Sequence, residues 1–70
     1  MELSELESDF IRFLKQKYEE TKQNLFYIPD CGPYIDKMQY LMKSLSEKGF
    51  IEVDEKYTAA SISLTEKAWL

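Results

Sequence analysis

A single glycine, Gly49, marks the point where the spacing of apolar residues changes, and this change constrains the fold more than any other feature of the chain. From Tyr34 to Lys48, apolar residues recur every three or four positions, which is typical of one face of an amphipathic α-helix. After Gly49, Phe50 to Val53 and Ala60 to Leu64 follow a period of two, which is typical of β-strands with one buried face. The sequence therefore predicts a helix over 34–48 that leads directly into two strands.

Turn-forming residues support these boundaries. Pro33 suits the first turn of a helix, where no N–H is needed, and Gly49 suits the position after the last turn, where φ is positive. The segment from Asp54 to Thr58 is short and polar, which predicts that it is the turn of an antiparallel hairpin. Thr65 is placed to cap a further helical turn through Ala68, Trp69 and Leu70. A helix followed by a hairpin makes the predicted fold class α+β.

The residues on both sides of the predicted hairpin resemble a known family. The run Leu45-Ser46-Glu47-Lys48-Gly49-Phe50-Ile51, and after the hairpin the run Ile62-Ser63-Leu64-Thr65-Glu66-Lys67, are similar to the recognition helix, wing and wing exit of bacterial winged helix-turn-helix regulators of the MarR and PadR type. Ala68 stands where those families commonly have glycine. The resemblance covers roughly half the chain. It implies a small winged-helix domain with a long N-terminal helix, a recognition-like helix and a C-terminal β-hairpin wing.

The N-terminal part of the chain predicts one long helix from about residue 3 to residue 22, because its apolar residues share one face at helical spacing. Acidic residues gather in its first turns and lysines in its last ones: Glu2, Glu5, Glu7 and Asp9, then Lys15, Lys17 and Lys22. This distribution complements the helix dipole. The alternative interpretation is an acidic surface for a basic partner.

The segment between this helix and Pro33 leaves two alternatives open. Leu25 to Ile28 is apolar throughout and suits a short first strand, while Pro29 to Pro33 is a cluster of turn residues. A helix-turn-helix needs a second helix before the recognition helix, and only residues 22–32 are available for it. Either this second helix is one irregular turn, or the first helix breaks near Lys17 and its second half takes that role.

Composition limits the chemistry that the chain can perform. Seventy residues suit a single domain, 1–70, and one cysteine without any histidine leaves neither an internal disulfide nor a Cys/His zinc site. Cys31 precedes the predicted helix N-terminus, a position that lowers a thiol pKa, but no histidine is present to pair with it. We therefore expect a buried cysteine, no metal, no cofactor and no enzymatic activity.

No apolar run approaches the roughly 20 residues that span a bilayer, and the N-terminus lacks the features of a signal peptide. The sequence thus predicts a cytoplasmic protein with no membrane partner.

The main functional prediction is a small DNA-binding regulator of transcription. If the helix over 34–48 enters the major groove of double-stranded DNA, its outward side chains would contact bases and phosphates: Lys37, Gln39, Tyr40, Lys43 and Ser44. A net charge of −4 and the acidic turn at Asp54-Glu55-Lys56 oppose phosphate binding. The alternative prediction is an acidic winged-helix module that binds protein instead, as an adaptor or an accessory protein of a mobile element.

The two ends of the chain supply a second candidate surface. In MarR-like proteins the chain ends form the dimer interface, so the resemblance implies a homodimer or partner interface at Leu3, Leu6, Trp69 and Leu70. Trp69 is the kind of large amphipathic residue that anchors interfaces. Its alternative role is that of a core tryptophan packed on the first helix.

Overall fold

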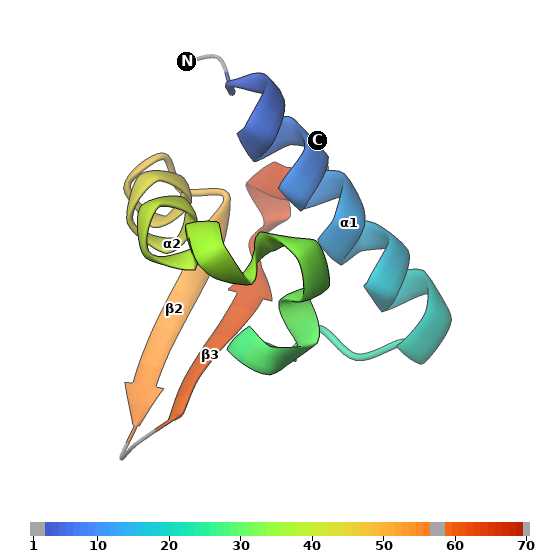
Figure 1. Ribbon diagram of the computed structural model, residues 1–70. Helices are drawn as coiled ribbons and strands as arrows, with labels where there is room; N and C mark the ends of the chain where they lie inside the picture. Colours follow the sequence, from blue (N-terminus) through green and yellow to red (C-terminus); the bar gives the residue numbers. More distant parts are fainter. Residues whose placement is uncertain (1–2, 57–58, 70) are drawn as a thin grey trace.

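A computed structural model describes residues 3–56 and 59–69 of the chain. The elements follow in the order α1 (Glu5–Thr21), β1 (Phe26–Tyr27), the 3₁₀ segment η1 (Ile28–Lys37), α2 (Met38–Glu47), β2 (Ile51–Lys56), β3 (Ala59–Leu64) and the 3₁₀ turn η2 (Glu66–Trp69). The hairpin of β2 and β3 projects away from the helices (Figure 1). This arrangement confirms the predicted α+β class and is compatible with a small winged-helix-like domain.

Helix α1 forms where the sequence predicts it and runs without a break. Ser4 is its N-cap, and the Ser4 hydroxyl accepts the backbone N–H of Glu7 at 3.2 Å while the Glu7 carboxylate accepts the backbone N–H of Ser4 at 2.9 Å. The helix ends at Lys22, whose φ of 59° is left-handed and whose N–H donates to the carbonyl of Tyr18. A break near Lys17 is therefore wrong, because the apolar stripe continues across that residue to Tyr18.

The α-helix predicted over 34–48 begins four residues later than expected, at Met38. Tyr34 to Lys37 belong instead to η1, which is kinked at Gly32, where φ is 52° and ψ is −118°. Lys37 has φ −108° and ψ 4°, which lies outside the helical region and separates η1 from α2. Between α1 and α2 the chain thus forms an irregular 3₁₀ segment and no α-helix within these described residues, which agrees with the first of the two alternatives except that the segment extends beyond residues 22–32.

The sheet is antiparallel with the strand order β1-β3-β2, which confirms both the hairpin and the short first strand. Ile51 lies opposite Leu64 and Val53 opposite Ile62, so these apolar side chains share one face of the sheet. Strand β2 continues through the residues 54–56, which the sequence assigned to the turn. The ladder extends past the apolar residues because backbone hydrogen bonds do not depend on apolar side chains. The other predicted turn residues, Tyr57 and Thr58, lie outside the described residues.

The junction after α2 confirms the predicted role of Gly49. The N–H of Phe50 donates to the carbonyl of Leu45 and the N–H of Gly49 to that of Ser46, with φ 84° at the glycine, which is a Schellman motif. Thr65 directly precedes the last turn, η2, as predicted, but its hydroxyl is bonded to another part of the chain. Its hydroxyl donates to the Gly49 carbonyl at 2.5 Å, and only its backbone carbonyl accepts the N–H of Ala68.

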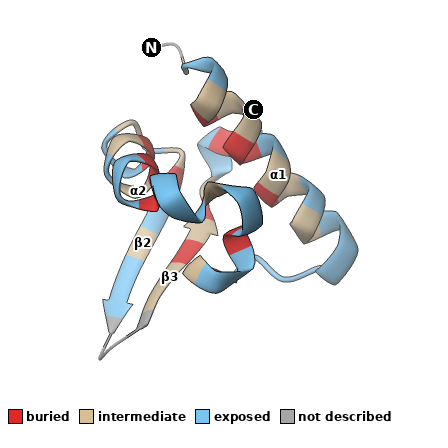
Figure 2. Cartoon of the chain, in the orientation of Figure 1, coloured by how far each residue is buried: buried red, intermediate tan, exposed pale blue. Residues whose placement is uncertain are grey.

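The core lies where α1, α2 and the apolar face of the sheet meet, and the outward sides of α2 and β2 are exposed (Figure 2). Its largest fully buried apolar side chains come from all three parts: Phe10, Leu14, Leu41, Leu45, Ile51 and Ile62. Asn24 fastens the loop after α1 to this core, because its side chain accepts the N–H of Leu64 at 2.8 Å and donates to the Leu64 carbonyl at 2.9 Å. The loop after α1 is therefore tied to strand β3.

Candidate interaction surfaces

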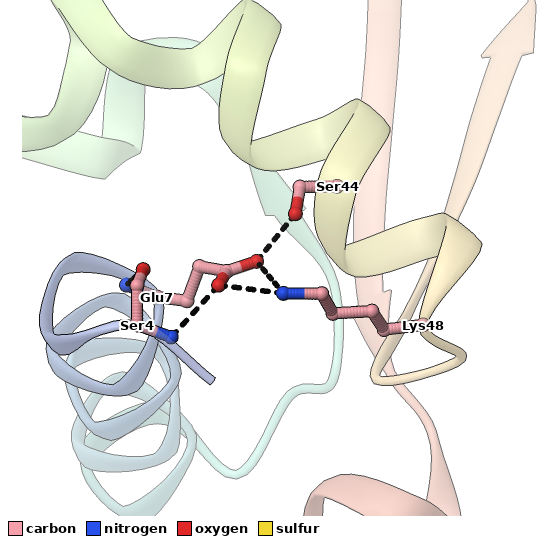
Figure 3. A network of polar contacts seen from close by, with 4 residues as sticks. All are labelled: Ser4, Glu7, Ser44 and Lys48. Atoms are coloured by element: carbon pink, nitrogen blue, oxygen red, sulfur yellow. Dashed lines mark hydrogen bonds and ion pairs between the residues drawn. The ribbon is translucent and has the colours of Figure 1, made fainter. Parts of the chain in front are cut away.

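A buried ion pair joins the first turn of α1 to the end of α2. Glu7 is only 1% exposed, and its carboxylate accepts hydrogen bonds from the Lys48 ammonium at 2.8 and 2.9 Å and from the Ser44 hydroxyl (Figure 3). The capping box with Ser4 orients Glu7, and Ser44 and Lys48 reach it together because they lie four residues apart on one side of α2. Ser44 was predicted to point outward toward DNA, and this is wrong.

The electrostatics of this network indicate a structural role. Burial by itself would raise the pKa of Glu7, but the ion pair with Lys48 and the hydrogen bonds from Ser44 and Ser4 outweigh burial and lower the pKa from 4.5 to about 2. A general acid or base works best with a pKa near the working pH, and Glu7 stays ionised far below it. The pair therefore fixes α2 against α1 rather than exchanging protons.

Four of the five residues predicted to contact DNA are exposed on or just before α2. Lys37, Gln39, Tyr40 and Lys43 all face solvent, and Tyr40 is 53% exposed. Lys43 borders two shallow grooves. One, of about 250 Å³, runs between α2 and β2 and includes Gln39, Val53 and Glu55, whereas the other includes Tyr40 and Glu47. Lys43 is therefore available to a ligand, but a carboxylate lies in each of its two grooves, and Lys37 is exposed outside both.

Strand β2 carries further exposed carboxylates, with Glu55 on the face toward α2 and Glu52 and Asp54 on the opposite face. It forms one edge of the sheet, and within residues 3–56 and 59–69 no strand pairs with its outer side. Glu52, Asp54 and Glu55 are all exposed along it. We define the α2–β2 surface as the exposed charged and amide side chains of these two elements: Gln39, Lys43, Glu47, Glu52, Asp54 and Glu55. Among the side chains of this surface that the structure describes, four are carboxylates and one is a lysine.

The described residues near both ends of the chain pack on the rest of the molecule. Leu3 and Leu6 are partly buried and pack against it, and Leu70 lies outside the described residues. Trp69 packs on the first helix, as one of the two interpretations had it, but it is not fully buried. It packs on α1 through an edge-to-face contact with Tyr18 at 5.3 Å between ring centroids, yet it is 43% exposed. The exposed part of its ring is available to a partner.

Cys31 is buried, as expected, but its pKa is shifted in the opposite direction from the expected one. Burial, and then the negative charge of Asp30, raise the pKa of the Cys31 thiol to about 11 against a smaller lowering by Lys17. The thiol donates to the carbonyl of Tyr27 at 3.4 Å, and Cys31 lies inside η1, not ahead of an α-helix. A neutral, buried thiol is not an activated nucleophile.

The Glu7 network was not predicted from the sequence, although two features of the sequence indicate it. Ser4 and Glu7 have the spacing of a capping box before an apolar run. Glu7 also lies three residues before Phe10 and four before Ile11, which places a carboxylate on the apolar face of the helix. A buried carboxylate needs a cation, and Lys48, seven residues after Leu41 on the apolar side of α2, was available to supply it.

Comparisons with protein-family models, curated proteins and solved structures found no match for this chain. In the part of the chain that the structure describes, no helix combines the length and apolar character needed to cross a bilayer. Among the same residues, no three His, Cys, Asp or Glu side chains form a group that could hold a metal ion. The geometry and charge of its surfaces are therefore the basis for assigning a function.

Proposed function

We propose that this chain is an acidic winged-helix-like module that binds another protein in the cytoplasm, and that its α2–β2 surface receives a basic segment of that partner. The charge of this surface is the observation that supports the proposal most strongly. Glu47 and Glu55 each border a groove together with Lys43, and Glu52 is exposed on the opposite face of β2. Such a surface repels phosphates and attracts cationic side chains, which speeds association and selects the partner.

The open edge of β2 suggests how such a segment would bind. An extended peptide can add a strand to an exposed sheet edge, where backbone hydrogen bonds supply affinity and alternate side chains supply specificity. β2 offers six residues for this pairing. A second copy of β2 would bring the same carboxylates to the edge and be repelled. A strand that carries lysine or arginine would instead be attracted by these carboxylates.

A DNA-binding regulator remains the second candidate, because Lys37, Gln39, Tyr40 and Lys43 are exposed on α2 or at its start. Amide and ammonium groups of these types meet base edges and phosphates. Lys37 and Lys43 alone, however, would neutralise few phosphates. A strong DNA binder can make about 6–10 phosphate contacts. A homodimer would double the number of lysines but also that of the carboxylates beside them. For this reason we rank DNA below a protein as the binding partner.

Calorimetric titration at low salt separates the two candidates. The ligands are a peptide of alternating lysine and valine, a peptide of alternating glutamate and valine, and a mixed-sequence DNA duplex. We expect saturable binding of the lysine peptide only. The double variant Glu52→Lys with Glu55→Lys reverses the charge at β2 and should abolish that binding, since each attraction becomes a repulsion.

The matched control is Glu19→Lys with Glu20→Lys, which changes the net charge equally at the exposed end of α1. It should leave binding of the lysine peptide nearly intact. If both double variants lost binding of the lysine peptide equally, the interaction would be an unspecific attraction between charges. That result would refute the proposal. Tight binding of the duplex that is lost in Lys37→Glu with Lys43→Glu would establish the second candidate in its place.

A further inference from the structure

A basic groove lies between α1 and the η2 turn and shares no residue with the α2–β2 surface. Leu3, Ile11 and Phe50 supply its apolar part. The cations that line it come from two elements: Arg12 and Lys15 on α1, and Lys67 on η2. We call it the α1–η2 groove. None of the described residues that line it carries a carboxylate, although the chain as a whole has a net charge of −4.

Two of the three cations are held in place by contacts that leave their charge uncompensated. The Lys67 ammonium donates to the Lys48 carbonyl at 2.7 Å and lies 4.9 Å from the centre of the Phe50 ring. The Lys15 ammonium lies 5.3 Å from the centre of the Trp69 ring. Carbonyl and ring contacts orient an ammonium without neutralising it. An incoming anion therefore meets cations whose positions are already restricted, which lowers the entropy cost of binding.

Arg12 is the third cation and differs from the other two. It pairs with Asp9 at 3.4 Å, but its own side chain is 77% exposed. A pair this exposed contributes little and is readily exchanged for another partner. Asp9 lies outside the groove, so the guanidinium can turn toward a carboxylate of a bound ligand. Its planar fork can hold such a carboxylate with two hydrogen bonds.

The size of the groove indicates what it can accept. Its volume of about 280 Å³ is just below the roughly 300–1,000 Å³ of typical small-molecule sites. Apolar side chains of a peptide would fit against Leu3, Ile11 and Phe50, and burying them would supply binding energy that phosphate or sugar groups cannot. We infer that the α1–η2 groove binds an acidic segment of a partner protein, which inserts an apolar side chain and sets carboxylates against Arg12, Lys15 and Lys67.

Titration of isotope-labelled protein with a peptide in which leucine recurs at helical spacing among glutamates tests this inference. We expect saturable shifts of amides in residues 11–15 and 66–69. The same peptide with glutamine in place of glutamate should bind at least about tenfold more weakly. Arg12→Glu with Lys15→Glu should weaken binding of the glutamate peptide by a similar factor. The neutral pair Arg12→Gln with Lys15→Gln should weaken it less and repeats the test with less disturbance of the fold.

The matched control is Lys22→Glu with Lys37→Glu, which gives the same net charge at exposed positions away from the groove. Equal weakening in the control, or equal affinity for the glutamine peptide, would overturn the inference. Self-association that disappears in the Arg12 and Lys15 variants would also overturn it, because the occupant would then be a second copy of the chain. Glu52→Lys with Glu55→Lys should leave this binding unchanged, so the inference and the proposed function can fail separately.

Discussion

Replacing Glu7 by glutamine should destabilise the fold in a way that depends on pH. The network lowers the pKa of Glu7 from 4.5 to about 2, and at about 1.4 kcal/mol per pKa unit the ionised form supplies about 3 kcal/mol of folding free energy. A core in a chain of this length rarely supplies more than about 3–5 kcal/mol. Because the folded-state pKa is lowered, this contribution is complete above about pH 4.5 and is lost as the pH falls toward 2.

Urea unfolding, followed by the fluorescence of the single tryptophan Trp69, measures this effect. At pH 7 we expect Glu7→Gln to lower the unfolding free energy by about 3 kcal/mol, because Lys48 loses its partner while its side chain is only 22% exposed. The difference from the wild type should shrink steadily as the pH approaches 2. Glu20→Gln, at an exposed position on α1, is the control and should change little at any pH.

The double variant Glu7→Gln with Lys48→Met separates the pair from the rest of the network. It should recover part of the lost stability, because no unpartnered cation then remains in the interior. A loss below about 1 kcal/mol for Glu7→Gln at pH 7, or a loss that does not vary with pH, would refute the reasoning. The hydrogen bonds of Figure 3 would then contribute no more than exposed contacts do.

Three further outcomes are expected. Cys31 should react with iodoacetamide near pH 8 far more slowly in the native protein than in urea, because its thiol is buried with a pKa of about 11; equal rates would contradict this. Gly49→Ala should cost about 1 kcal/mol in urea unfolding, because φ is 84° while the added Cβ would meet only the Lys67 side chain at 3.7 Å; unchanged stability would speak against the Schellman motif. Asn24→Ala should cost about 1–3 kcal/mol, more than Gln23→Ala beside it, because it removes both hydrogen bonds to Leu64.

Local patterns in the sequence were sufficient to predict α1, the hairpin and the Gly49 junction. An apolar stripe predicts α1, a period of two predicts the strands, and a glycine predicts the left-handed residue between them. Each of these features is determined by neighbours within a few residues. The start of α2 was not predicted, because the kink at Gly32 and the non-helical conformation of Lys37 depend on how η1 packs.

The candidate site was predicted less well than the fold, because exposure depends on which elements pack together. A helical wheel places Ser44 on the outward side of its helix, but Ser44 lies at the flank of that side, next to the first turn of α1, and its hydroxyl donates to the Glu7 carboxylate. Strand β2 was predicted too short, because an edge strand needs no apolar residues along its exposed length. Lys37, Gln39, Tyr40 and Lys43 did prove exposed, but Lys43 shares its two grooves with the carboxylates of Glu47 and Glu55.

The amide spectrum of the protein during titration with the lysine and valine peptide tests the central claim most directly, since it shows where the partner segment binds. We expect the largest shifts in residues 51–55 and along the exposed side of α2, with the shifts weakening as salt is added. Shifts spread evenly over all acidic positions, or none at β2, would contradict the account. If a DNA duplex shifted the amide signals of α2 and the peptide shifted none, nucleic-acid binding would be the better account of the function.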